Sequence, residues 1–408
     1  MRDEAIYRDR FVVSDPSITY LDGNSLGRLP KRTAELLPQV LHQQWGSELI
    51  GSWNKHWLAL STRIGDKIGK IIGAPAGTTI VCDSTSVNLY KLAKGLLHRD
   101  RSRQVILTDR SNFPTDQYIL QGLAFEASQD RALRRVCLDD VSPESLCDRL
   151  ADALTDDVGL VSLSHVHYKS GMALDLARIT RLVQDRGAAM LWDTSHSVGA
   201  MPIDIEESGA EGAVGCTYKY LNGGPGAPAF LYLRSDLRDA VRNPIQGWFG
   251  AARPFEFGED YTPASGVQRF LVGTPPILSM AAIEPGVDLV LEAGISWLRS
   301  RSLRMTEYLI EQYDVRLLPR GYRLQTPRDP IYRGSHVSLQ HEYAWPITQA
   351  LIQEHRVVPD FRQPDTIRFG ITPLYTTYDE LDRTVDALVN VLEQRQHLHY
   401  PAERQGVT

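Results

Sequence analysis

Two charged residues, Asp193 and Lys219, each follow a short apolar run in the middle of the 408-residue chain. The runs, Ala188–Trp192 and Val214–Tyr218, have the composition of buried strands. Side chains at the carboxyl ends of strands in an open α/β sheet point into the crevice where such sheets bind ligands. A lysine that forms a Schiff base and a carboxylate that keeps a pyridine nitrogen protonated are the two groups that pyridoxal phosphate (PLP) chemistry requires. The pair alone is a weak signal, because a chain of this length contains many Asp and Lys residues.

A run of hydroxyl residues marks a candidate phosphate site. Ser84, Thr85 and Ser86 precede an apolar-periodic segment that begins at Leu89. Free backbone N–H groups, hydroxyl donors and the positive end of a helix dipole together bind phosphate. The alternative is a plain Ser/Thr N-cap, and these residues alone favour it.

Two further strings carry side chains that suit the same site. Phe113 and Asp116 follow the predicted strand Val105–Thr108, so a ring could stack there on a flat cofactor and a carboxylate could bond to its edge. The alternative is a loop whose Pro and Thr start the next helix. His196 follows Asp193 by three residues and is either a ligand contact or a structural histidine.

Charged groups in apolar surroundings need partners. Lys219 follows an apolar run and precedes the glycine-rich segment Asn222–Gly226, so its amine must be paired or deprotonated unless it lies on a surface loop. Arg368 is the only charged residue in the alternating segment Thr366–Ile371. Its guanidinium binds a carboxylate bidentately, and that carboxylate belongs either to a ligand or to a structural ion pair.

Alternating strands and helices must position these residues. Such alternation predicts βαβ units and a mostly parallel sheet. The predicted strands are Val105–Thr108, Leu133–Cys137, Val158–Leu163, Ala188–Trp192, Glu211–Cys216 and Ala227–Leu233. The predicted helices are Ser86–Leu97, Thr115–Ala124, Pro143–Leu154 and Leu176–Arg186.

The pattern changes after about residue 290, where a smaller α+β unit is predicted. Its predicted helices are Ser296–Tyr313, Trp345–Glu354 and Asp379–Glu393, and its predicted strands are Val315–Leu318, Ser335–Leu339 and Thr366–Gly370. A further helix, Thr33–Glu48, could pack on either part. We therefore expect a large domain of residues 50–290 and a small domain of residues 1–49 and 291–408.

Composition argues against several classes of protein. The formal net charge of −6 argues against a nucleic-acid or anionic-membrane partner. No run of about 18 apolar residues predicts a transmembrane helix, and the first residues lack the pattern of a signal peptide. The four cysteines show no C-x-x-C spacing, so we expect neither a disulfide framework nor a metal site, and a cytoplasmic location.

Six strings spread through most of the chain match the pattern of one family. They are YLDGNSLG at 20–27, SNFPTD at 111–116, CTYKYLNGG at 216–224, GWFG at 247–250, RGSHVS at 333–338 and RFGITPLY at 368–375. With these strings the chain resembles the kynureninases. The resemblance implies the α/β fold-type-I PLP-dependent transferase architecture, a large domain with a mostly parallel sheet flanked by helices plus a smaller α+β domain. It also implies a homodimer with the site at the subunit interface, and cleavage of the Cβ–Cγ bond of L-kynurenine to anthranilate and L-alanine.

The resemblance places roles on matching positions. Lys219 would form the Schiff base and later take the substrate α-proton, Asp193 would hold the pyridine nitrogen, and Phe113 would stack on the ring. Arg368 would bind the substrate α-carboxylate, and Tyr218 would protonate the carbon left by cleavage. The remaining cofactor positions are Thr85, Ser86 and Tyr218 at the phosphate, Trp248 and Thr274 from a second subunit, and Asp116, Ser164 and His196.

Pocket positions in the resemblance bear on the substrate. Trp53, Gly273 and Thr274 resemble the bacterial members, which prefer an unsubstituted ring, and an indole in place of polar donors removes partners for a ring hydroxyl. The family has His after GWFG where this chain has Ala251, and the stretch Ser52–Trp57 is one residue shorter. The alternative substrates are therefore 3-hydroxykynurenine or another ring-modified kynurenine. Tryptophan catabolism, NAD biosynthesis and secondary metabolism all stay open as pathways.

Two rival interpretations of the sequence stay open. A related enzyme with another reaction, such as a cysteine desulfurase or an aminotransferase, is the first. A desulfurase needs a mobile nucleophilic Cys, and Cys216 lies on a predicted buried strand. A catalytically silent scaffold is the second, and the joint presence of Asp193, Lys219 and Arg368 argues against it.

Overall fold

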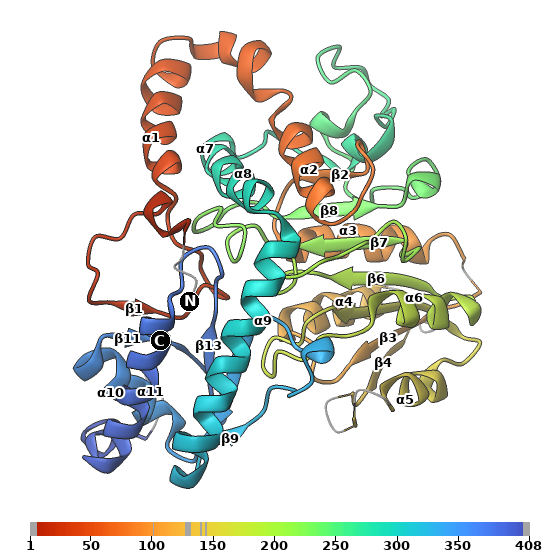
Figure 1. Ribbon diagram of the computed structural model, residues 1–408. Coiled ribbons are helices and arrows are strands. Elements are labelled where there is room, and N and C mark those ends of the chain that lie inside the picture. The colour runs from red at the N-terminus through yellow and green to blue at the C-terminus, as the bar shows by residue number, and fades with distance from the viewer. Residues whose placement is uncertain (1–5, 101, 127–131, 139–140, 143–144, 403–408) are drawn as a thin grey trace.

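A seven-stranded sheet flanked by helices forms the centre of the chain (Figure 1). The computed structural model describes residues 6–100, 102–126, 132–138, 141–142 and 145–402. The strand order is β2-β8-β7-β6-β5-β3-β4, and β8 alone runs against its neighbours, which confirms the mostly parallel α/β sheet. The strands are β2 (Thr79–Val81), β3 (Val105–Asp109), β4 (Ala132–Val136), β5 (Val158–Ser164), β6 (Ala189–Asp193), β7 (Gly212–Gly215) and β8 (Phe230–Leu233).

Side chains of alternate residues fill the core on each face of this sheet. In β6, Met190 and Trp192 belong to one hydrophobic core and Leu191 belongs to the other. Parallel strands need crossover connections, and helices on both faces supply them. Helices α3 (Thr85–Leu97) and α4 (Pro114–Glu126) cover one face, and α5 (Leu146–Ala153) and α6 (Leu176–Asp185) cover the other.

The C-terminal part of the chain builds a second sheet with its own core. The sheet is antiparallel, in the order β12-β13-β10-β9. Its strands are β9 (Arg323–Leu324), β10 (His336–Gln340), β12 (Asp360–Arg362) and β13 (Thr366–Gly370). Helices α9 (Ile295–Gln312), α10 (Ala344–His355) and α11 (Tyr378–Glu393) pack on it and share its core.

Helix α9 and the N-terminal segment belong to both parts. Leu298 near the start of α9 lies in the core of the large sheet, whereas Met305 lies in the second core. Strand β1 (Thr19–Tyr20) pairs with β11 (Val357–Val358), so the N-terminal segment joins the C-terminal part. In Figure 1, α9 runs from one part to the other.

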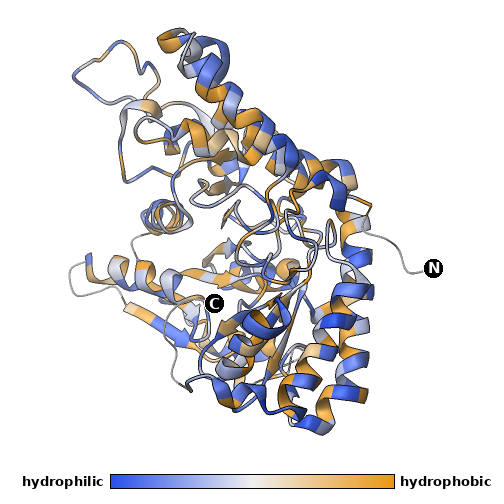
Figure 2. Ribbon diagram, turned by 90° about the vertical axis from the view of Figure 1, so that its left-hand side faces the viewer, coloured by the Kyte–Doolittle hydropathy of each residue, from blue (hydrophilic) through white to orange (hydrophobic). Residues whose placement is uncertain are grey.

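The remaining helices pack beside the large sheet. These are α1 (Lys31–Gln39), α2 (Leu60–Ile71), α7 (Ile277–Ala281) and α8 (Ile283–Ala293). Figure 2 shows helices banded in hydrophobic and hydrophilic colours, as expected where one face is buried. None of the described helices is both long and apolar enough to cross a membrane.

Most predicted elements coincide with observed ones, but one is wrong. Residues Val315–Leu318, predicted as a strand, form helical turns that continue α9 through Tyr313–Leu317 and Leu318–Arg320. A short apolar run after an amphipathic helix has no periodicity of its own, so the sequence does not distinguish a strand from a continuation of the helix. The predicted helix Thr33–Glu48 is α1 continued by a wider, π-type helical segment over Val40–Trp45.

Two predicted elements are shorter in the structure. The predicted strand Ala227–Leu233 is reduced to β8, because residues 226–229 form the connection that enters it. The helix predicted over Pro143–Leu154 is α5, and positions 143–144 lie outside the described residues.

Candidate active site

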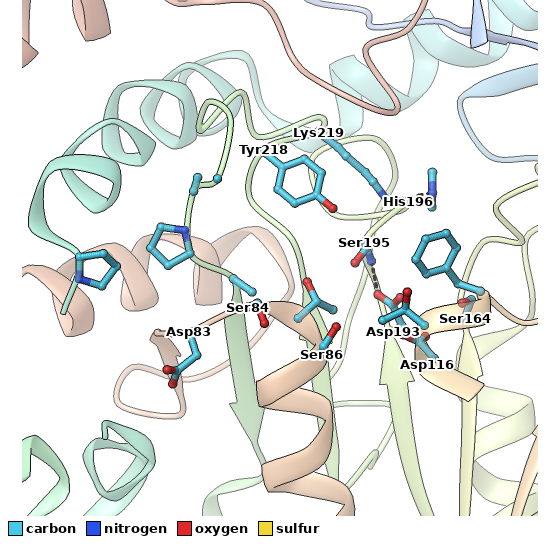
Figure 3. A pocket seen from close by; sticks show the side chains of 18 residues that line it. Asp83, Ser84, Ser86, Asp116, Ser164, Asp193, Ser195, His196, Tyr218 and Lys219 are labelled. Atoms are coloured by element: carbon cyan, nitrogen blue, oxygen red, sulfur yellow. Dashed lines mark hydrogen bonds between the residues drawn. The ribbon is translucent and has the colours of Figure 1, made fainter. Parts of the chain in front are cut away.

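A cavity of about 400 Å³ lies at the carboxyl ends of β5 and β6, beside the start of α3 (Figure 3). Side chains from several strand ends and one helix start converge there, as is usual in α/β sheets. Nine of the residues proposed from the sequence line it: Thr85, Ser86, Phe113, Asp116, Ser164, Asp193, His196, Tyr218 and Lys219.

Two buried carboxylates meet at the bottom of the cavity. Asp193 ends β6 and accepts a hydrogen bond from the Ser195 N–H at 2.7 Å. Burial and the adjacent Asp193 raise the pKa of Asp116 well above its usual range, so Asp116 carries a proton. Its Oδ2 has no hydrogen-bond partner in the described protein. A ligand with a protonated ring N–H fits this place, because two buried carboxyl groups lie side by side and one oxygen of Asp116 is unpaired.

Lys219 enters the cavity from the loop after β7. Its Nζ lies 2.9 Å from Nε2 of His196 and 6.0 Å from the ring centroid of Phe113. Burial and the charge of Lys219 hold the pKa of His196 well below its usual range, so this imidazole is neutral. With Nε2 assigned as the acceptor, Nδ1 carries the proton and has no partner among the described groups. Among the described residues, the amine is therefore held by a neutral acceptor and by no carboxylate.

The start of α3 forms the other end of the cavity. Ser84 is the N-cap, and its side chain accepts from the Val87 N–H at 3.4 Å. Thr85 and Ser86 follow in the first turn and line the cavity. The first N–H groups of a helix have no intrahelical acceptors and bind anions well. The N-cap and the phosphate-binding interpretations are thus compatible, because different residues carry them.

Tyr218 and Cys216 precede Lys219 in the same loop. The neighbouring Cys216 and burial raise the pKa of the Tyr218 phenol, so this group is a proton donor. Burial raises the pKa of Cys216, whose side chain is 1% exposed. A buried, protonated thiol is a poor nucleophile, which argues against desulfurase chemistry at this position.

Arg368 does not line the cavity. It is fully buried, donates from Nε to Asp360 Oδ2 at 2.5 Å, and donates from Nη2 to Ser25 Oγ at 3.1 Å. Its Nη1 donates to the carbonyl of Tyr168, whose ring packs edge-on against Phe113 at 5.3 Å. In this structure Arg368 makes the structural ion pair that was the alternative, one aromatic layer behind the cavity.

The residues expected to arrive from a second subunit also lie outside the cavity. Trp248 is 40% exposed and stacks on Phe257, with ring centroids 5.8 Å apart. Gly273 and Thr274 are exposed.

The other residues expected at the substrate ring also lie outside the cavity. Trp53 is half-buried against Phe249, at 5.4 Å between ring centroids. Ala251 and Trp248 line a separate surface cavity of about 480 Å³.

Several lining residues were not singled out from the sequence. Ala227, Pro228 and Ala229 form a wall of small residues, and Ser195 and Pro276 also line the cavity. The glycine-rich segment Asn222–Gly226 indicated a tight turn beside a ligand just before this wall. No pattern in the sequence near Pro276 indicated that it lines the cavity. Among the described residues, no group of three or more His, Cys, Asp or Glu side chains could hold a metal ion.

Two family models match the chain. The model described as "Aminotransferase class-V" matches residues 19–338, and that described as "Kynureninase C-terminal domain" matches residues 298–388. A kynureninase of Pseudomonas fluorescens is 42% identical over 95% of this chain and 92% of its own. A kynureninase of Burkholderia pseudomallei (strain 1106a) is 40% identical over 96% of this chain and 95% of its own.

Solved structures agree on the fold. The apo cysteine desulfurase of Thermococcus onnurineus NA1 matches with a TM-score of 0.80, covering 97% of this chain and 99% of its own at 18% identity. A mutant of the cystine C–S lyase C-DES, with glycine covalently linked to its PLP cofactor, matches with a TM-score of 0.80, covering 92% of this chain and 97% of its own at 19% identity. Identities this low speak for the fold alone, whereas the identity to curated kynureninases extends over nearly the whole chain. The chain therefore belongs to the kynureninase family, on the fold of the class-V aminotransferases.

Proposed function

We propose that this chain is a PLP-dependent hydrolase that cleaves the Cβ–Cγ bond of L-kynurenine and releases anthranilate and L-alanine. One observation carries the proposal: Lys219, Asp193, Phe113 and the hydroxyl-bearing start of α3 all face one cavity. The curated relatives with this sequence pattern are kynureninases.

The cavity suits the cofactor at each end. Asp193 would hold the pyridine nitrogen, Phe113 would cover a face of the ring, and Thr85 and Ser86 would bind the phosphate. Lys219 would carry the cofactor covalently. Bound in this way, PLP supplies an electron sink that stabilises a carbanion beside the substrate nitrogen. Asp116, Ser164 and His196 complete the proposed set.

Three side chains of the cavity would move or hold protons. As a free amine, Lys219 would take the substrate α-proton, and His196 Nε2, which lies 2.9 Å from Nζ in this structure, would accept a hydrogen bond from the resulting ammonium. Tyr218 is protonated because its pKa is raised, so it can donate to the β-carbon when the aromatic acid leaves.

Substrate recognition involves groups beyond the cavity lining. Arg368 would bind the α-carboxylate, which requires the guanidinium to exchange one of its present acceptors. Ser25 Oγ, at 3.1 Å, is a neutral acceptor that a carboxylate can replace. Trp53, Gly273 and Thr274 would contact the aromatic ring, and the indole of Trp53 favours an unsubstituted ring over 3-hydroxykynurenine.

The proposal includes the assembly. Trp248 and Thr274 are exposed and lie outside their own chain's cavity. In a homodimer they would reach the cavity of the partner subunit and complete its cofactor site. We propose a cytoplasmic homodimer that acts in tryptophan catabolism. Residues 50–290 would form the large domain, and residues 1–49 and 291–408 the small one.

Absorbance and a two-substrate assay test this function. Purified protein supplied with PLP should absorb at about 420 nm and release anthranilate from L-kynurenine. The Lys219→Ala variant should lose turnover, whereas Lys70→Ala, at an exposed position of α2, should keep it. Wild-type protein that takes up no PLP would refute the proposal. A higher kcat/KM for 3-hydroxykynurenine than for kynurenine would refute the assignment of the ring pocket.

A further inference from the structure

Lys91 is a buried cation directly behind the candidate phosphate site. It lies in the second turn of α3 and its side chain is 0% exposed. Its Nζ donates to Asp83 Oδ2 and to the carbonyl oxygen of Phe270, the latter at 2.6 Å. Burying an ammonium group costs several kcal/mol unless it is paired and hydrogen-bonded, as it is here. So costly a group at the start of the phosphate-facing helix calls for an explanation.

Asp83, the partner of Lys91, shapes the start of α3. It has φ = +44°, an unfavourable left-handed conformation for a residue with a side chain. The Ala229 N–H donates to its carbonyl oxygen at 2.8 Å, and the Lys91 ammonium holds its carboxylate. The chain turns here from β2 into the helix, so this conformation sets the direction in which Ser84 and the first helical N–H groups point.

The charges around the cavity show why the Asp83–Lys91 ion pair matters for phosphate binding. Asp83 lines the cavity and its side chain is 30% exposed, so its charge faces the proposed phosphate position. Among the lining residues the only cation is Lys219, which lies away from Asp83 in Figure 3. Without Lys91, a carboxylate would stand beside a phosphate dianion with no nearby positive side chain from the lining.

We propose that Lys91 is a positioning residue for the cofactor phosphate. It cancels the charge of Asp83 and holds that residue in the left-handed turn from which Thr85 and Ser86 face the phosphate. The inference rests on the proposed PLP function. By this proposal, the affinity for the cofactor phosphate depends also on Lys91, a buried residue that need not touch the cofactor.

The second bond of Lys91 extends this role. Phe270 ends the short helical turn Gly266–Phe270, and its side chain is fully buried. Four residues later the chain reaches the exposed Thr274. One ammonium group therefore joins the phosphate end of its own cavity to the base of the segment proposed to enter the partner's cavity.

Binding of PLP and of pyridoxal to the apoprotein tests the proposal. Pyridoxal keeps the ring and the aldehyde but lacks the phosphate, so the ratio of the two dissociation constants isolates the phosphate end. Both would be measured by absorbance and tryptophan fluorescence for wild type, Lys91→Met, Asp83→Asn and the double variant. Lys94→Met is the matched control, because Lys94 lies in the same helix and pairs with Glu126 and Tyr90 at the surface.

The expected changes have opposite signs. Lys91→Met should weaken PLP binding by at least about tenfold, since an unpaired carboxylate then faces the phosphate, while pyridoxal binding changes less than about twofold. Asp83→Asn should strengthen the preference for PLP over pyridoxal by about threefold or more, and the double variant should return towards wild type. Lys94→Met should leave the ratio unchanged.

The outcomes separate this inference from the proposed function. A Lys91→Met protein with the wild-type PLP-to-pyridoxal ratio overturns the role of Lys91 while PLP dependence stands. If Lys91→Met does not fold, Asp83→Asn decides, and an unchanged ratio there overturns the proposal too. If wild-type apoprotein binds neither compound, the PLP assignment itself fails.

Discussion

Replacing Arg368 by Met tests whether the buried guanidinium recognises the substrate. Methionine keeps much of the length and apolar character of the side chain and removes all five N–H donors. Hydrogen bonds to a charged group contribute about 1.5–3 kcal/mol each, so losing two from a bidentate contact raises the barrier by about 3–6 kcal/mol. That corresponds to a loss in kcat/KM on the order of 10²–10⁴-fold.

The same change also removes a structural ion pair. Asp360 loses the guanidinium of Arg368 but keeps that of Arg362, whose Nε lies 2.9 Å from Asp360 Oδ2. Breaking a buried pair costs about 3–5 kcal/mol, and the remaining Arg362 should hold the loss of stability at the lower end of that range. Arg333→Met is the matched control, because Arg333 is equally buried and does not line the cavity. Its Nη2 lies 2.7 Å from Glu307 Oε2.

Steady-state kinetics with two compounds separates recognition from stability. L-kynurenine carries the α-carboxylate, and its decarboxylated analogue kynuramine does not. The Arg368→Met variant should bind L-kynurenine much more weakly, whereas inhibition by kynuramine should stay within about twofold of wild type. Arg333→Met should be less stable with an unchanged KM. A folded Arg368→Met enzyme with the wild-type KM and kcat for L-kynurenine would refute the assignment.

Three further predictions concern stability and reactivity. Because the folded-state pKa of Asp116 is raised, its stabilising contribution is complete below the ordinary value of 3.8 and is lost as pH rises through the folded value. The melting temperature of the Asp116→Asn apoprotein should therefore exceed that of wild type at alkaline pH and approach it in acid. Melting temperatures that differ by the same amount at every pH would contradict this. Thr377 and Glu380 form a capping box at the start of α11, so Thr377→Ala should lower the free energy of unfolding in urea by about 0.5–2 kcal/mol, and no loss would rule out the cap. Burial raises the pKa of Cys82 to about 12, so iodoacetamide at pH 8 should alkylate it only in denaturant, and modification of the folded protein would disprove its burial.

The sequence predicted the elements whose patterns are local. Thr366–Gly370 is a strand with the predicted bounds, because an alternating segment has one face for each set of side chains. The helix predicted over Leu176–Arg186 is α6, and Asp175 caps it by accepting from the Arg178 N–H at 3.0 Å. By contrast, β2 spans only Thr79–Val81, which is too short for periodicity to show, and it was not predicted.

The candidate site could be predicted where strand ends carry it. Asp193 and Lys219 follow neighbouring strands, so the rule for parallel sheets brings them together. Arg368 and Trp248 depend on how distant segments pack, and a local pattern does not reveal their neighbours. The burial of Lys91 is a similar case: as a lysine in a helix it has the appearance of a surface residue, and only the fold shows that Asp83 and Phe270 surround it.

The reversed strand β8 has a consequence for Lys219, the lysine proposed to carry the cofactor. Because β7 and β8 are antiparallel neighbours, the chain between them is a hairpin connection and needs no crossover helix. Lys219 sits in this connection, which is pinned internally by the Gly223 N–H to the Thr217 carbonyl at 2.8 Å and by Thr217 Oγ1 to the Pro228 carbonyl at 2.7 Å. Both ends of its backbone are thus anchored in the same sheet. If Lys219 holds the cofactor as proposed, only its four-carbon side chain would have to move between the cofactor and the substrate α-proton, and the backbone beneath it would stay in place.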